Sequence, residues 1–336
     1  MEFDEILLER KSRIKEYINS GSYLPLKRHE LAVMLDVPPS DISLYNMVID
    51  RLISEGSAVE TKKGKIMPAE KLNIYSGIFT GNSKGFGFVR IEGMENDIFI
   101  PSDFVNGAIN KDKVLVKIKE QSHDGMRAEG EILKIIENGN SGIVGTFDSV
   151  KGYGFVIPDD KKIGRDIYIP EGRTKGAVNG HKVVVKITKR ATEKSNAEGI
   201  VTEIIGHIND PGVDIMSIIR QFELPGEFPD DVKKQIESID PDIIDEKSMI
   251  GRDDYRDVLT VTIDGDDSKD FDDAVSIKIL DNGNYELGVH IADVTEYVTE
   301  NSPLDKEALK RATSIYLVDR VIPMLPYKLS NGICSL

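Results

Sequence analysis

A tandem duplication in the middle of the chain is the feature that most constrains its fold. Four sequence blocks recur in the same order, about 67 to 69 residues apart. The paired blocks are KGFGFV (84–89) with KGYGFV (151–156), DIFIP (97–101) with DIYIP (166–170), GAINKDKVLVKI (107–118) with GAVNGHKVVVKI (176–187), and AEGEILKII (128–136) with AEGIVTEII (197–205). Self-similarity at a fixed period indicates repeated structural units. The sequence therefore predicts two copies of one small domain, at 71–138 and 139–206.

Each copy consists of short β-branched and aromatic runs separated by turn residues. In the first copy these runs are GIFTG, GFGFVRI, NDIFIP, KVLVKI and GEILKII, and the second copy has a counterpart for each. Short strands at this spacing are typical of a small five-stranded barrel.

Aromatic side chains of each copy are expected to share one strand face. Alternate residues of a strand point to the same side, so Phe86 and Phe88 lie together and Phe99 joins them from the next strand. The equivalent residues of the second copy are Tyr153, Phe155 and Tyr168. Such rings either fill a core or form an exposed platform. The adjacent Lys84 and Lys151, the glycines and the duplication favour a platform for single strands, where stacking is worth roughly 1–3 kcal/mol per base.

The N-terminal segment has helical periodicity followed by a hairpin pattern. Apolar residues recur at helical spacing over 4–20, 26–37 and 40–56, and residues 57–68 alternate around a Lys-Gly turn. This order predicts a winged helix-turn-helix over 1–70. Modules of this type bind nucleic acid or proteins, and the sequence leaves both open.

An acidic cluster stands out in the last part of the chain. Residues 264–274 read DGDDSKDFDDA, with six aspartates in eleven positions. Residues 206–336 hold 13 Lys and Arg against 28 Asp and Glu, a difference of −15 that equals the net charge of the whole chain. The slightly basic middle segment permits a face for an anionic ligand.

Three structures are conceivable for this acidic cluster. An EF-hand loop is excluded, because its glycine and its glutamate positions hold Lys269 and Val275. A solvated loop is the simplest alternative. The apolar runs 258–263 and 274–280, with a DNGN hairpin turn after the second, predict instead that buried strands fix the carboxylates, which would then share hard cations such as Mg²⁺.

Composition limits the compartment. No apolar run approaches the ~18 residues of a membrane span, the N-terminus lacks an apolar signal core, and Cys334 is the one cysteine. We therefore expect a cytoplasmic protein that does not associate with a membrane and has no disulfide framework.

Two family resemblances follow from these motifs. KGFGFV and DIFIP resemble the RNA-contacting motifs of cold-shock-type oligonucleotide-binding folds, although Pro101 and Pro170 stand where that family often has histidine. The stretches 262–277, 290–298 and 322–336 resemble the ribonuclease II / ribonuclease R family of 3′-to-5′ exoribonucleases. The domain order is similar to ribonuclease R in particular. The resemblance implies a multidomain, mainly β protein with α-helices, whose residues 207–336 form the start of an α+β ribonuclease catalytic domain that is incomplete here.

The resemblance also implies an activity and its residues. The catalytic and Mg²⁺-binding positions match Asp264, Asp270, Asp272 and Asp273. Tyr316, after a helix whose start is indicated by Ser302 and Pro303, matches a base-stacking aromatic. The implied reaction is hydrolysis of single-stranded RNA to nucleoside 5′-monophosphates. Two alternatives stay open: an RNA-binding protein without nuclease activity, and a winged-helix regulator that binds duplex DNA.

Overall fold

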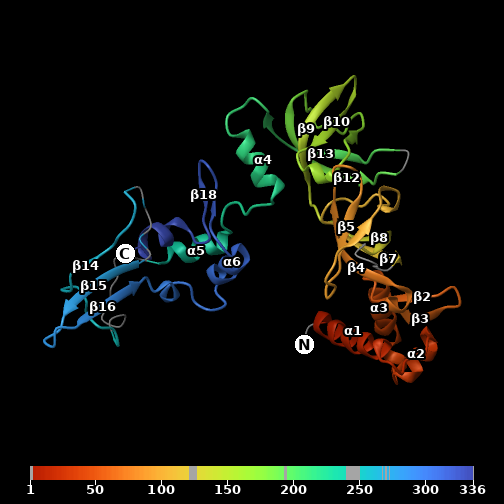
Figure 1. Cartoon of the computed structure of the whole chain (residues 1–336), viewed down its shortest axis with the longest axis horizontal. Helices are drawn as coiled ribbons and strands as arrows, with labels where there is room; N and C mark the ends of the chain where they lie inside the picture. The colour runs from red at the N-terminus through yellow and green to blue at the C-terminus, as the bar shows by residue number, and fades with distance from the viewer. Residues whose placement is uncertain are drawn as a thin grey trace. The chain divides into compact units, whose positions relative to one another are not determined.

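The computed structural model divides into two compact units, Met1–Phe222 and Glu223–Leu336 (Figure 1). It describes residues 3–120, 127–192, 195–239, 250–266, 268, 271 and 273–335. No helix in these ranges is both long and apolar enough to cross a lipid bilayer.

Residues 3–68 fold into three helices and a small antiparallel sheet. The elements are α1 (Phe3–Asn19), β1 (Leu26–Lys27), α2 (Arg28–Met34), α3 (Ile42–Ser54), β2 (Ala58–Glu60) and β3 (Lys65–Pro68), with sheet order β1-β3-β2. Their apolar faces meet in one core that includes Ile18, Leu31, Leu52 and Ile66. The expected helices and hairpin are therefore present, and the assignment of this segment as a winged helix-turn-helix stays a prediction.

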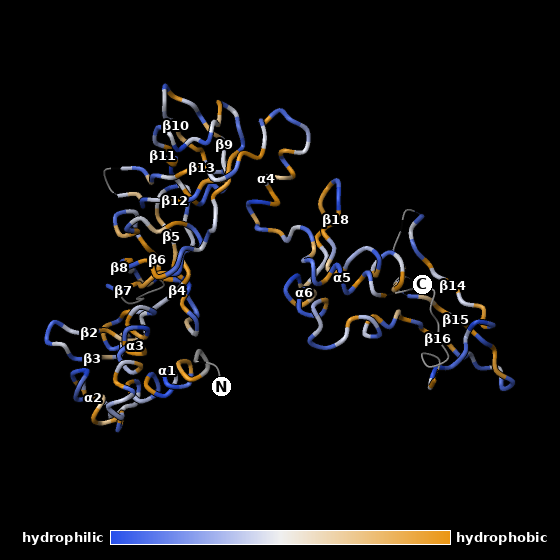
Figure 2. Tube along the Cα trace, turned by 180° about the vertical axis from the view of Figure 1, so that it is seen from behind, coloured by the Kyte–Doolittle hydropathy of each residue, from blue (hydrophilic) through white to orange (hydrophobic). Residues whose placement is uncertain are grey.

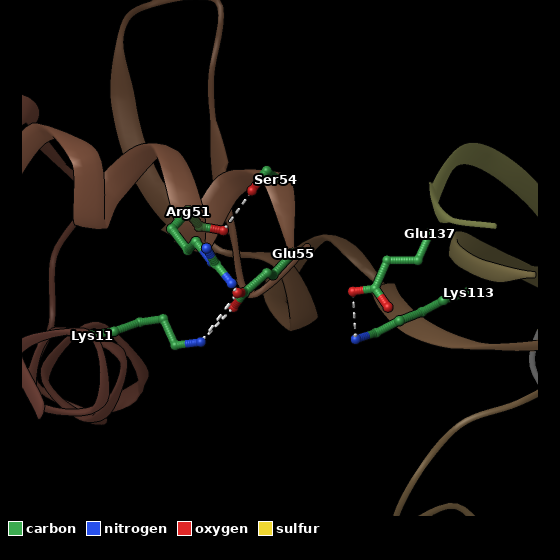
Figure 3. Close-up of polar contacts among 6 residues, drawn as sticks. All are labelled: Lys11, Arg51, Ser54, Glu55, Lys113 and Glu137. Carbon is green, nitrogen blue, oxygen red and sulfur yellow. Dashed lines mark hydrogen bonds and ion pairs between the residues drawn. The ribbon is translucent and has the colours of Figure 1, made fainter. Parts of the chain in front are cut away.

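The N-terminal segment packs against the first barrel. Ala69, Ile74 and Leu115 form a small buried cluster at this junction. Gly56 has a positive φ of 77°, and a Cβ placed on it would lie 1.9 Å from a Leu115 methyl group, so only glycine fits there. Figure 3 shows the ion pairs on the two sides of the junction: Glu55 with Lys11 and Arg51, and Lys113 with Glu137.

The duplicated segment forms two closed five-stranded barrels of the same topology, which confirms that prediction. The first contains β4 (Ile74–Gly81), β5 (Gly87–Arg90), β6 (Ile98–Ile100), β7 (Lys113–Glu120) and β8 (Glu129–Glu137), in the order β4-β5-β6-β8-β7. The second contains β9 (Ile143–Val150), β10 (Tyr153–Pro158), β11 (Ile167–Ile169), β12 (His181–Lys189) and β13 (Glu198–His207), in the order β10-β11-β13-β12-β9. One parallel pair closes each barrel, β6 with β8 and β11 with β13.

The second glycine of each aromatic block, Gly87 in KGFGFV and Gly154 in KGYGFV, is required by the core of its barrel. A Cβ on Gly87 would lie 2.3 Å from the Phe79 ring, and a Cβ on Gly154 would lie 2.4 Å from the Phe147 ring. Phe79 and Phe147 are almost fully buried. The glycine positions thus face inward over a large ring, and alternation along the strand turns the neighbouring aromatic residues outward.

A helix follows the second barrel and belongs to the same unit. Helix α4 (Val213–Gln221) contacts β9, β12 and β13. Arg220 on this helix pairs with Glu203 of β13 at 2.9 Å. The domain limits expected from the sequence stay predictions.

The second unit combines short helices with a three-stranded sheet. Its elements are α5 (Asp230–Glu237), β14 (Thr260–Val261), β15 (Asp273–Ile279), β16 (Tyr285–Ile291), α6 (Pro303–Arg311), β17 (Ile315–Tyr316) and β18 (Val321–Ile322), and the sheet order is β14-β15-β16. The expected hairpin is confirmed by full pairing of β15 with β16. The expected helix start is also confirmed, since the Asp305 amide donates to Ser302 Oγ at 3.1 Å.

Candidate nucleic-acid interface

Three phenylalanine rings gather on one face of the first barrel. Phe88 lies opposite Phe99 in the β5–β6 register, and Phe86 precedes β5. Ring centroids are 5.9 Å apart for Phe86–Phe88, 5.6 Å for Phe86–Phe99 and 5.7 Å for Phe88–Phe99. All three rings are half-buried and none belongs to the barrel core. We call these residues the first aromatic face.

The second barrel repeats the arrangement. Phe155 lies opposite Tyr168 in the β10–β11 register, and Tyr153 is 36% exposed. Centroids are 6.0 Å apart for Tyr153–Phe155 and 5.6 Å for each ring with Tyr168. These residues form the second aromatic face, and they too lie outside the core of their barrel. The core interpretation left open by the sequence is therefore excluded for both sets of rings.

Cationic side chains lie next to both faces. Lys84 and Lys151 are exposed in the turns that lead into the aromatic strands. The guanidinium carbon of Arg127 lies 5.2 Å from the centroid of the Phe88 ring. Sequence reasoning missed Arg127 because the corresponding residue of the second copy is Asn196, so the repeat gives no sign of it. Rings beside cations on a barrel surface can stack bases and attract phosphates.

The acidic cluster is only partly described. Asp264 is exposed, and Asp273 is an exposed residue at the start of β15, opposite Ile291. The other two expected ligands, Asp270 and Asp272, lie outside the described residues. Within the described part of the chain, no three His, Cys, Asp or Glu side chains converge to hold a metal ion. The donor type suits Mg²⁺, but the carboxylates that can be placed do not form a metal site by themselves.

The strands around the acidic cluster are not buried, which corrects the expectation from their apolar sequence. Ile263 is 87% exposed, Ile277 67% and Leu287 65%, whereas Ala274 and Ser276 are buried. The β15–β16 register places Ile277 and Leu287 opposite each other on one face of the sheet. No described residue covers that face, and Figure 2 shows hydrophobic positions along these strands. Apolar composition predicts the strands correctly but cannot supply the layer that would bury them.

Two further side chains of this unit bear on the site: Tyr316, which the sequence resemblance matches to a base-stacking aromatic, and His290, which lies beside the acidic cluster. Tyr316 in β17 is 72% exposed, so it is available for stacking and is not a core residue. The Nε2 atom of His290 lies 2.8 Å from Ser276 Oγ, and its ring contacts Tyr255 with centroids 5.4 Å apart. His290 therefore packs within the sheet.

Comparisons with known proteins find matches over the two barrels and the second unit. Family models match as a ribonuclease B OB domain at 77–135, a cold shock domain at 155–229 and an RNB domain at 252–336. Ribonuclease R of Acidithiobacillus ferrooxidans is 34% identical over 98% of this chain and 75% of its own length. The chain belongs to the ribonuclease R family. Its match to Ribonuclease R 1 of Lactococcus lactis is 41% identical over 96% of this chain.

A solved ribonuclease R has a similar structure. This chain spans less than half the length of that protein and of two of its curated relatives. Mycoplasma genitalium RNase R in complex with ribose-methylated single-stranded RNA matches with a TM-score of 0.68 and 26% identity, over 77% of this chain and 41% of that chain. This family member spans 41% of the Lactococcus lactis relative and 46% of ribonuclease R from Thermotoga maritima.

Proposed function

We propose that this ribonuclease R family chain binds single-stranded RNA on its two aromatic faces. The observation that carries the proposal is the presence of three half-exposed rings, outside the core, at the same place on each barrel. Stacking on such rings is worth roughly 1–3 kcal/mol per base and tolerates any base. Lys84, Lys151 and Arg127 add positive charge for the phosphates. The related RNase R solved with single-stranded RNA supports the same ligand class.

The catalytic part of the proposal concerns the acidic cluster of the RNB domain. There, Asp264, Asp270, Asp272 and Asp273 would hold Mg²⁺, and Tyr316 would stack on a base near the cleaved bond. Mg²⁺ bound to carboxylates supplies an activated water and stabilises charge on phosphate oxygens. The reaction would be hydrolytic removal of nucleoside 5′-monophosphates from the 3′ end of single-stranded RNA. Family membership and the acidic motif support this activity.

A second function is favoured for the chain by itself: RNA binding without cleavage. The carboxylates that the structure describes do not converge, and the apolar face of the sheet beside them is uncovered. A site that does not fix its ligands positions no substrate for in-line attack.

One experiment separates these functions. The chain is incubated with 3′-labelled oligouridylate and Mg²⁺, and both binding and mononucleotide release are measured. Release supports the exoribonuclease, and binding without release supports the binding module. Phe88→Ala combined with Phe155→Ala should weaken binding by about tenfold or more, because each substitution removes one stacking ring. Tyr285→Ala is the matched control, since Tyr285 is an exposed ring of β16 in the second unit and belongs to neither face. Equal affinity of all three proteins would contradict the proposal.

A further inference from the structure

The two barrels interlock through the segment that connects β6 with β7. Ile109 of this segment belongs to the core cluster of the second barrel, which also includes Phe147 and Val183. The first barrel thus places a side chain inside its neighbour. The two cores are therefore joined by apolar packing and not only by a linker.

A buried ion pair lies at the same joint. Asp112 is 1% exposed, and its Oδ2 accepts from Arg190 Nη1 at 2.6 Å, while its Oδ1 accepts from Nη2 at 3.3 Å. Arg190 directly follows β12 of the second barrel and also donates to Asn138 of the first. The remaining acceptor capacity of Asp112 is used by the amides of Ile109, at 2.8 Å, and Gly139, at 3.0 Å. Bidentate pairs of this kind fix orientation as well as distance.

A second polar contact and a close backbone approach prevent rotation about the ion pair. Asn110 Nδ2 donates to Asp160 Oδ2 at 2.8 Å, and Asn110 Oδ1 accepts from the Gly81 amide at 3.3 Å. A Cβ on Gly81 would lie 2.2 Å from the Lys162 carbonyl oxygen, and one on Gly107 would lie 2.6 Å from the Ala191 carbonyl oxygen. The barrels are thus held at several separate points.

We infer that Asp112 and Arg190 are positioning residues that hold the two aromatic faces at one fixed separation, so that a single RNA strand binds both. This inference rests on the proposed function. When two binding faces are rigidly joined, binding to the first raises the effective concentration at the second, and affinity rises by about 10²–10⁴ if the ligand can reach both. A strand too short to reach both gains nothing.

The charge of Asp112 makes the inference testable by substitution. Asp112→Asn removes a negative charge, which by electrostatics alone would leave RNA affinity unchanged or increase it. A positioning role requires the opposite result. Arg190→Met breaks the same pair from the other side. Arg220→Met is the matched control, because the Arg220–Glu203 pair joins α4 to β13 and does not connect the barrels.

The experiment measures affinity against RNA length with the full chain. Oligouridylates from about 4 to about 24 nucleotides cover the roughly 4–16 nucleotides that one such barrel occupies. For the wild type and Arg220→Met, we expect affinity to rise at least tenfold once the strand reaches both faces. In Asp112→Asn and Arg190→Met this rise should be clearly smaller, because the remaining contacts at Ile109 and Asn110 hold the barrels less firmly, while affinity for the shortest oligonucleotides that bind stays within about twofold.

The outcomes are distinguishable. If the wild type binds no RNA, the proposed function fails. If it binds RNA but its affinity does not rise once the strand is long enough to reach both faces, only the positioning inference fails. A length effect as large as that of the wild type in both joint variants also overturns the inference. Circular dichroism establishes that the variants are folded. If either variant fails to fold, the distance between spin labels at Glu92→Cys and Glu171→Cys, with Cys334→Ser, is measured in the other proteins. A broad distribution in the wild type contradicts a fixed separation.

Discussion

At the scale of single residues, the glycines of the aromatic strands link each barrel core to its aromatic face. A Cβ on Gly87 would lie 2.3 Å from the Phe79 ring and 2.6 Å from the Thr80 carbonyl oxygen. We expect Gly87→Ala to destabilise the first barrel by about 1–3 kcal/mol, because overpacking forces the ring or the backbone to move. Urea unfolding followed by tyrosine fluorescence measures the loss. Gly21→Ala is the control, since nothing lies within 4 Å of a Cβ at that position.

Glu55 gives a pH dependence that can be assigned to one side chain. Its burial alone would raise the pKa, but hydrogen bonds and ion pairs from Lys11 and Arg51 outweigh burial and lower the pKa of Glu55 below its ordinary value (Figure 3). A depressed folded-state pKa contributes stability above the unfolded pKa of about 4.3, and that contribution disappears as the pH falls through the folded-state pKa.

We therefore expect Glu55→Gln to cost about 0.5–1 kcal/mol at neutral pH, since ion pairs near the surface contribute little. The difference from wild type should shrink as the pH falls below the unfolded pKa and vanish once the pH lies below the lowered folded-state pKa of Glu55, where the carboxylate is protonated in both states. Thermal unfolding across this pH range measures both values. Glu9→Gln, which removes an exposed pair with Arg13, should show no comparable change. A constant difference at every pH would assign the effect to shape and not to charge.

At the scale of elements, helix α6 is fixed by a buried arginine. Arg311 Nε donates to Glu307 Oε1 at 2.8 Å, its Nη2 donates to the Gly226 carbonyl at 2.9 Å, and its guanidinium lies 3.7 Å from the Phe228 ring centroid. We expect Arg311→Met to destabilise the second unit by about 3–5 kcal/mol, because a buried carboxylate loses its main partner.

The double variant Arg311→Met, Glu307→Leu tests the cause of that loss. It should recover part of the stability, since removing both charges leaves no unpaired buried carboxylate. Recovery cannot be complete, because the Gly226 carbonyl still lacks its donor. Arg252→Met, which breaks an exposed pair with Glu296, is the control. A double variant no more stable than Arg311→Met would show that the carboxylate is not the source of the effect.

Sequence reasoning succeeds where the information is local or repeated. Two copies of each block predicted both barrels, and strand alternation predicted the shared face of Phe86, Phe88 and Phe99. It fails where burial depends on distant segments. The apolar residues around Ile277 specify a strand, yet the sheet face that they form is exposed in the described structure. Likewise, nothing local to Asp112 predicts its pairing with Arg190, 78 positions away.

At the scale of the whole molecule, the two aromatic faces proposed to bind RNA and the acidic cluster belong to different units. Both aromatic faces and the barrel joint lie in Met1–Phe222, and the described acidic residues lie in Glu223–Leu336. Because the first unit holds its own cores and the second barrel carries α4, the first unit has the contacts of an independently folding body.

We therefore expect a fragment of residues 1–222 to fold cooperatively and to bind oligouridylate within about threefold of the full chain, since stacking supplies the affinity. The dependence of affinity on salt concentration reports how many phosphates the cationic side chains contact, so it should be less steep for the fragment only if residues 223–336 contact the RNA. Titrations of both proteins at several salt concentrations measure affinity and slope together. A fragment that folds but binds more than tenfold more weakly, with a smaller slope, would place part of the RNA-binding surface in residues 223–336 and would contradict the assignment of binding to the two aromatic faces.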